Sequence, residues 1–203
     1  MSMFDFDDIY KEAAAKYNKC VFIEIGVWTG ESTSCLLHAI RNNEKHILLL
    51  CMDNFEGANV SSPHWNKMKQ EWKTDNQREA FNKRLSTTAF KENHHYLVME
   101  GNSHDSLDTL LDYRKNNICF ILRETGDQVL LADVEINFIY IDGDHSYKGC
   151  LGDMERAWQL LAEGGTMAGH DAHDPAVRRA VNDFASKHSV NVNHRRNSWV
   201  IYK

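Results

Sequence analysis

Residues 21–32 constrain the fold of this chain more than any other segment. An apolar run there carries the acidic Glu24 and breaks at Gly26 and Gly30, and a helical pattern then begins at Glu31. Glycine has no Cβ, so the backbone can turn sharply and a ligand can approach the main chain closely. The segment predicts a buried strand, a glycine turn and a helix N-terminus. That order fits a nucleotide-binding corner, and it also fits a plain strand-to-helix connection.

The spacing of the glycines distinguishes this turn from that of the dinucleotide oxidoreductases. Those enzymes favour Gly-x-Gly-x-x-Gly, which places a pyrophosphate at the helix N-terminus. Here Trp28 occupies the middle position, and Glu24 would repel a phosphate. A carboxylate at that place suits a ligand with an ammonium group. The pattern therefore disfavours a nicotinamide cofactor.

Composition narrows the classes of protein further. The chain has 203 residues, of which 42% are hydrophobic and 26% charged, as expected for one globular domain over residues 1–203. A net charge of −6 argues against nucleic acid as a partner, and no apolar run reaches the length of a membrane span. Five scattered cysteines without a Cys-x-x-Cys pair predict reduced thiols and a cytoplasmic protein. A homo-oligomer is compatible with this composition.

Strand and helix patterns alternate along the chain. Apolar runs predict five strands, at residues 20–25, 46–52, 96–100, 136–141 and 166–169. Helical patterns occur within residues 1–18 and at residues 31–41, 75–85, 106–113, 151–161 and 175–187. Two further runs, at 190–193 and 198–202, predict a C-terminal antiparallel hairpin. The order implies an α/β fold: a Rossmann-like, doubly wound, mostly parallel seven-stranded sheet that ends in this hairpin.

Two segments leave alternatives open. Residues 118–131 fit either an extra hairpin or a strand-loop-strand. Residues 55–95 form a long, partly aromatic connection, which predicts either a lid that determines substrate specificity or an extra helical layer on the sheet.

Polar side chains recur at the ends of the predicted strands. Ligands of open α/β sheets bind beyond the carboxyl ends of the strands, so this recurrence predicts an active site at that edge. The residues are Glu24, Asp53, Asn102 with Ser103, Asp142 with His145, and His170 with Asp171.

Two of these positions carry a more specific expectation. Asp53 follows Gly26 by 27 residues, where a carboxylate can accept both hydroxyls of a ribose; the alternative is an acidic cap or loop residue. Ser103 would then lie near the adenine. Asp142 and His145 form a plausible acid/base pair, unless they only shape a tight turn around Gly143.

The chain resembles a known family in two places. Glu-x-Gly-x-x-x-Gly from Glu24 resembles motif I of the class I S-adenosylmethionine-dependent methyltransferases. The more specific block is Tyr-Ile-Asp-Gly-Asp-His-Ser-Tyr-Lys-Gly, followed by Asp-Met-Glu-Arg-Ala-Trp-x-Leu-Leu-x-x-Gly-Gly-Thr-x-Ala-Gly-His-Asp. It resembles the metal-dependent sugar O-methyltransferases of macrolide biosynthesis and the cephalosporin-hydroxylase-like proteins. The resemblance covers about residues 21–171.

The resemblance implies roles for individual residues. S-adenosylmethionine would be bound by Glu24, Gly26, Gly30, Ser32, Asp53, Ser103 and Asp142. A divalent cation, Mg²⁺ or Mn²⁺, would be held by Asp142, His170 and Asp171, and His145 would be the general base. The chain departs from the family at His170, where the metal-dependent relatives carry a carboxylate. Imidazole suits Zn²⁺, Mn²⁺ or Fe²⁺ better than Mg²⁺, so the cation is softer, more weakly held, or absent with His170 acting on substrate.

These observations favour transfer of a methyl group from S-adenosylmethionine to a hydroxyl of a small molecule, such as a sugar. His145 and Asp142 would be the catalytic residues. Two alternatives remain open: a non-catalytic module that binds S-adenosylmethionine or a nucleoside, and a metal-dependent hydrolase. The altered metal position favours the binding module, whereas a hydrolase would leave Glu24, the glycine turn and Asp53 without a role.

Overall fold

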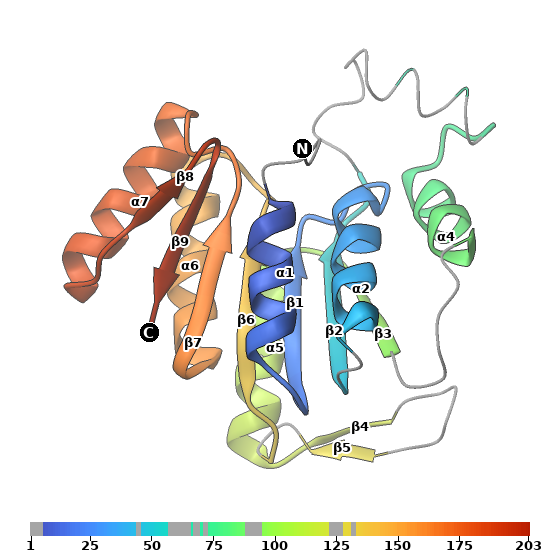
Figure 1. Ribbon diagram of the computed structural model, residues 1–203, viewed down its shortest axis with the longest axis horizontal. Helices are drawn as coiled ribbons and strands as arrows, with labels where there is room; N and C mark the ends of the chain where they lie inside the picture. The colour runs from blue at the N-terminus through green and yellow to red at the C-terminus, as the bar shows by residue number, and fades with distance from the viewer. Residues whose placement is uncertain are drawn as a thin grey trace.

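The protein is built around a seven-stranded sheet with the order β3-β2-β1-β6-β7-β9-β8 (Figure 1). A computed structural model describes residues 6–43, 46–56, 66, 70, 73–87, 95–121, 128–130 and 133–203. The strands are β1 Cys20–Ile25, β2 Ile47–Asp53, β3 His95–Glu100, β6 Ile136–Ile141, β7 Leu161–Gly169, β8 Asn193–Arg195 and β9 Ser198–Tyr202. The first five run parallel to one another, and β9 runs antiparallel to both β7 and β8. The predicted fold class is therefore confirmed.

Helices cover both faces of the sheet. On the face toward the viewer in Figure 1 lie α1 (Asp7–Lys16) and α2 (Glu31–Asn42), with α4 (Gln77–Thr87) at the edge. Behind the sheet lie α5 (Ser103–Asn116) and α6 (Tyr147–Leu160), with α7 (Pro175–His188) beside α6. Each layer has its own buried cluster of apolar side chains. This arrangement is the doubly wound one expected from alternating strands and helices.

Strand β1 shows why the sequence of the central strands is continuously apolar. Phe22 packs into the cluster of α1 and α2, whereas Val21 and Ile23 pack into that of α5, α6 and α7. Successive side chains of a strand point to opposite faces, so a strand covered on both sides needs apolar residues at nearly every position. All six residues of β1 are buried, including Glu24.

The structure decides one open alternative and corrects the bounds of two strands, since β7 begins at Leu161 and not at residue 166. Residues 118–131 contain an antiparallel hairpin of β4 (Cys119–Ile121) and β5 (Gln128–Leu130). The first strand of the C-terminal hairpin was predicted at residues 190–193, but β8 begins only at Asn193. Val190 and Val192 instead pack, partly buried, against the core. This packing, and not a strand, explains why both residues are apolar.

Capping side chains set the starts of two helices earlier than predicted. Asn102 accepts a hydrogen bond from the His104 N–H, so α5 begins at Ser103 and not at residue 106. Ser146 accepts one from the Gly149 N–H, so α6 begins at Tyr147 and not at residue 151. Both helices therefore begin close to the carboxyl edge of the sheet.

The described part of the long connection 55–95 is mainly α4. Phe81 and Leu85 are fully buried in the same cluster as α2, and the Phe81 ring lies directly over Gly30. This part forms a helical layer. Most of the remaining connection, including residues 57–65 and 88–94, lies outside the described residues, so the predicted lid remains a prediction.

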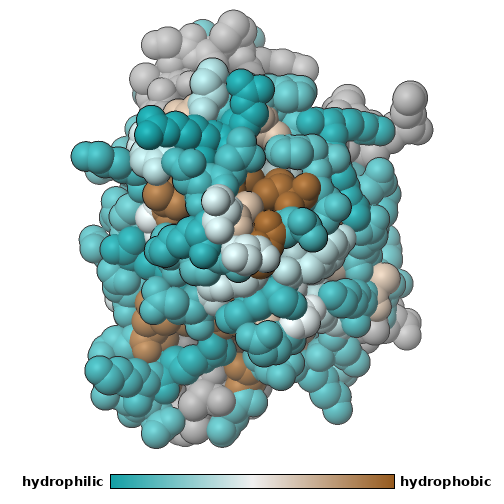
Figure 2. All heavy atoms as spheres, turned by 90° about the vertical axis from the view of Figure 1, so that its left-hand side faces the viewer, coloured by the Kyte–Doolittle hydropathy of each residue, from teal (hydrophilic) through white to brown (hydrophobic). Residues whose placement is uncertain are grey.

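No helix in the described part of the chain is long and apolar enough to cross a membrane. On the side that carries α7 and the C-terminal hairpin, hydrophilic side chains predominate and hydrophobic ones form small separate patches (Figure 2).

Candidate active site

The carboxyl ends of the five parallel strands form one continuous row. Backbone hydrogen bonds join each end to the next. They run from Gly101 N to Asp53 O at 3.0 Å, from Gly26 N to Met52 O at 2.8 Å, from Asp142 N to Ile25 O at 2.8 Å and from His170 N to Ile141 O at 3.1 Å. The polar residues predicted at separate strand ends are thus brought to one edge of the sheet.

Gly26 allows the two central strands to meet there. Its φ is +81°, and a Cβ at this position would lie 2.0 Å from the carbonyl oxygen of Asp142. No side chain fits that space, and a left-handed backbone conformation also favours glycine. The glycine turn after β1 therefore lies directly against the end of β6. Asp142, the first of the catalytic candidates in the sequence, follows β6 there.

Four titratable side chains gather at the ends of β6 and β7. His145 Nε2 lies 3.4 Å from Asp142 Oδ1 and 3.2 Å from Asp171 Oδ2. His170 Nδ1 lies 3.3 Å from Asp171 Oδ1 and 3.8 Å from Asp142 Oδ1. Because β6 and β7 are parallel neighbours, with Ile141 opposite Gly169, residues 28 apart in the sequence come into contact. The predicted catalytic and metal residues are therefore side by side.

The electrostatics of this cluster follow from its carboxylates. The hydrogen bond to Asp142 raises the pKa of His145, against the opposing effect of burial. Burial raises the pKa of Asp142, while His145 and His170 oppose that rise. The hydrogen bond from His170 lowers the pKa of Asp171. The cluster thus favours an ionised Asp171 and a protonated His145.

The donor atoms of Asp142, His170 and Asp171 fit a divalent cation. One ligand atom from each lies within 4.8 Å of the other two. A six-coordinate cation with bonds of about 2.1 Å places neighbouring ligand atoms about 3 Å apart, so a small inward movement would close the site. Two carboxylates and one imidazole suit Mn²⁺, Fe²⁺ or Zn²⁺.

Glu24 is the cofactor-binding candidate that lies within β1. Its carboxylate is fully buried, and Oε1 accepts a hydrogen bond of 3.0 Å from the Tyr10 hydroxyl on α1. Burial raises the pKa of Glu24 to about 7, although the hydroxyls of Ser32, Thr33 and Tyr10 act in the opposite direction. A buried carboxyl group of this kind would be stabilised in its charged form by an ammonium group.

Asp53 holds the glycine turn to the end of β2. Its Oδ2 accepts the Trp28 N–H at 2.7 Å, and its Oδ1 accepts the Phe55 N–H at 2.6 Å. Each carboxylate oxygen can accept a second hydrogen bond, so a ribose diol could still be bound. Asp53 therefore orders the turn and remains a candidate for ribose recognition.

Sequence reasoning missed three residues close to these candidates. Tyr10 on α1 contacts Glu24 across 14 residues of sequence, and Asn197 in the β8–β9 turn contacts Asp171 across 26. Asp153 on α6 is fully buried, and burial raises its pKa to about 6, with Ser103 and His104 opposing the rise. Each of these three contacts depends on how separate elements pack together. The sequence carries no local signal for such packing.

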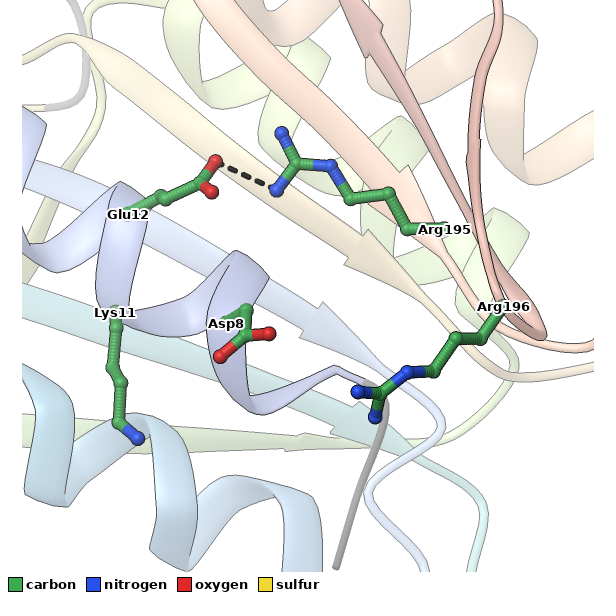
Figure 3. Close-up of a pocket in the computed structure, with 5 residues that line it drawn as sticks. All are labelled: Asp8, Lys11, Glu12, Arg195 and Arg196. Carbon is green, nitrogen blue, oxygen red and sulfur yellow. Dashed lines mark ion pairs between the residues drawn. The ribbon is translucent and has the colours of Figure 1, made fainter. Parts of the chain in front are cut away.

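A separate pocket of about 320 Å³ lies between α1 and the β8–β9 turn (Figure 3). Its lining consists of Asp8, Lys11, Glu12, Arg195 and Arg196. Arg195 already pairs with Glu12 at 2.7 Å, as the dashed line in Figure 3 shows. None of the predicted site residues lines this pocket.

Comparisons with known proteins agree with this architecture. A family model described as a methyltransferase domain matches residues 23–172. No curated protein sequence matches the chain.

Three solved structures share the fold at low sequence identity. A TDP-rhamnose 3′-O-methyltransferase of calicheamicin biosynthesis has 14% identity and a TM-score of 0.59, covering 97% of this chain and 76% of that one. The O-methyltransferase NovP has 14% identity and a TM-score of 0.58, covering 98% and 79%. The O-methyltransferase TomG of Streptomyces achromogenes, solved with S-adenosylmethionine, has 13% identity and a TM-score of 0.59, covering 100% and 80%.

The parallel sheet with its C-terminal antiparallel hairpin is the arrangement expected of a class I methyltransferase, and the row of polar strand ends lies where such a fold binds its ligands. The particular family follows from the match over residues 23–172: this chain belongs to the family of that methyltransferase domain. The resemblance inferred from motif I and from the block around Asp142 is thus confirmed.

Proposed function

We propose that this protein transfers a methyl group from S-adenosylmethionine to a hydroxyl group of a small molecule. The observation that carries the proposal is the position of His145 and two carboxylates directly beside the glycine turn of a methyltransferase fold. The O-methyltransferases among the structural neighbours support the same chemistry. A sugar is the acceptor class that the family resemblance favours.

Most of the polar residues at the strand ends would bind the cofactor. Glu24 would accept the ammonium group of the cofactor, Asp53 the ribose hydroxyls, and Gly26 and Gly30 would leave room for close approach. Ser32, Ser103 and Asp142 complete the proposed cofactor contacts. S-adenosylmethionine supplies an activated methyl group, so the protein has mainly to orient the acceptor and remove its proton.

His145 is the proposed base. In the structure its Nε2 faces carboxylate oxygens, which can only accept, so Nε2 carries a proton in this arrangement. The deprotonated ring could instead take the proton of an acceptor hydroxyl at Nε2. A divalent cation held by Asp142, His170 and Asp171 would lower the pKa of that hydroxyl.

The cofactor assignment predicts an effect of Asp53→Ala. S-adenosylhomocysteine should raise the melting temperature of the wild-type protein, because it binds the native state. Asp53→Ala should weaken this binding by about 1–3 kcal/mol, since charge-assisted hydrogen bonds are lost. Isothermal titration calorimetry measures both proteins, with the exposed Glu163→Ala as a control expected to bind like wild type. Tight binding of NAD⁺ without any response to S-adenosylhomocysteine would refute the assignment.

The cation site predicts binding of Mn²⁺. Titration followed by electron paramagnetic resonance should show one site in the wild-type protein and a strong loss of affinity in Asp171→Ala, because one of three protein ligands is removed. The variant should still bind S-adenosylhomocysteine. Full methyl-transfer activity after chelation would exclude a catalytic cation and leave the cofactor assignment intact.

A further inference from the structure

Asn197, in the turn between β8 and β9, contacts the segment that follows β7 through three polar groups. Its carbonyl oxygen accepts the Ala172 N–H at 2.9 Å. Its side-chain Oδ1 accepts the His173 N–H at 3.0 Å, and its Nδ2 donates to Asp171 Oδ1 at 3.0 Å. The turn thus holds three consecutive residues at the edge of the cation site.

The backbone of Asp171 needs such support. Its φ is +53°, in the left-handed region that non-glycine residues rarely adopt. Conformations of this kind persist when the surrounding contacts determine them. Asn197 contacts both the Asp171 side chain and the N–H groups of the next two residues. These bonds fix the direction in which the Asp171 carboxylate leaves the chain.

The hydrogen bond from Asn197 also separates the roles of the two carboxylate oxygens. Oδ1 accepts from Asn197 and lies 3.3 Å from His170 Nδ1. Oδ2 lies 3.2 Å from His145 Nε2, the proposed base. A neutral amide is suited to this task, because it donates a hydrogen bond without bringing a positive charge that would compete with a cation.

We propose that Asn197 is a positioning residue of the cation site, which orients Asp171 so that one oxygen is presented to the metal ion. The inference rests on the proposed function, since it concerns the cation of that site. Groups that hydrogen-bond to metal ligands commonly change metal affinity by 10–100-fold when they are removed. Asn197 lies 26 residues after Asp171, in the turn between β8 and β9. It is outside the sequence motifs that indicated the site.

The test is a Mn²⁺ titration, followed by electron paramagnetic resonance, of wild type, Asn197→Ala and Asn197→Ser. Both variants should bind Mn²⁺ about 10–100-fold more weakly, because neither side chain reaches Asp171 with a donor. Asn197→Ser keeps a polar group in the turn and guards against a loss of folding in the alanine variant. Asn193→Ala, at an exposed position of the same hairpin, is the matched control and should bind like wild type.

Two further measurements separate positioning from a merely structural role. S-adenosylhomocysteine affinity should stay within about two-fold of wild type, because Asn197 contacts residues 171–173, none of which is a cofactor candidate. Damage to the whole fold would weaken the binding of both ligands together. In an Asp171→Ala background, Asn197→Ala should have little additional effect on Mn²⁺ affinity, since its partner is already gone.

The outcomes distinguish this inference from the proposed function. Equal Mn²⁺ affinity in wild type and both Asn197 variants would overturn the positioning role alone, as would full additivity with Asp171→Ala. Wild-type protein that binds S-adenosylhomocysteine but no Mn²⁺ would overturn the cation site together with this inference. Failure to bind S-adenosylhomocysteine would instead count against the proposed function.

Discussion

Replacing His145 by alanine should reduce the turnover of methyl transfer by roughly 10²–10⁴-fold, the usual effect of losing a general base. Affinity for S-adenosylhomocysteine should remain nearly unchanged, because the carboxylate of Asp142, the proposed cofactor residue that His145 contacts, remains in the variant. His145→Gln should be almost as impaired, since an amide cannot take the proton. The measurement requires an acceptor, which a screen of sugars and catechol-like alcohols would provide.

The same assignment sets the direction of the pH dependence. The base must be deprotonated, so the rate should rise with pH through the pKa of His145. The bond to Asp142 raises this pKa, and the rise in rate should therefore occur above the ordinary value of about 6.5. His194→Ala, at an exposed position of β8, is a suitable control and should keep wild-type turnover. Wild-type turnover in His145→Ala with any accepted substrate would end the base assignment and make Asp144 the next candidate for that role.

Glu24→Gln should make the protein more stable in alkaline solution and less able to bind its cofactor. The pKa of Glu24 is raised to about 7 by burial, so the folded state favours the protonated carboxyl group. The stability that this group provides is complete below its unfolded pKa of about 4.5 and is lost as pH rises through 7. Glutamine resembles the protonated form, keeps an acceptor for Tyr10 and does not lose this stability.

Urea unfolding at several pH values measures the effect. The free energies of unfolding of wild type and Glu24→Gln should be similar near pH 4.5 and differ by about 1–3 kcal/mol above pH 8, with the variant more stable. The exposed Glu163→Gln should show no such divergence. A constant difference across the pH range would contradict the raised pKa.

Cofactor binding provides the second half of this prediction. An ammonium group would stabilise the buried charge of Glu24, so the neutral glutamine should bind S-adenosylhomocysteine more weakly than wild type. A variant that is more stable but binds equally well would remove Glu24 from the cofactor site. The expected trade of stability for binding is common at functional sites.

The sequence by itself determined the order of strands and helices and the residues at the strand ends. These features are local: continuous apolar runs indicate strands covered on both faces, and Gly26, Asp142 and His170 directly follow such runs. Parallel strands place their carboxyl ends at one edge, so the sequence also predicted that Asp142, His145, His170 and Asp171 would meet. Helix starts were less accurate, because they depend on whether Asn102 and Ser146 actually cap the helix.

Only the tertiary structure decided which distant side chains support the site. Tyr10 reaches Glu24 because α1 packs over the sheet, and Asn197 reaches Asp171 because the C-terminal hairpin pairs with β7. Neither contact has a local sequence signal, since both join residues through packing of separate elements. The raised pKa of Glu24 has the same origin: a glutamate at the end of an apolar run can be exposed or buried, and the layer of helices above it decides which.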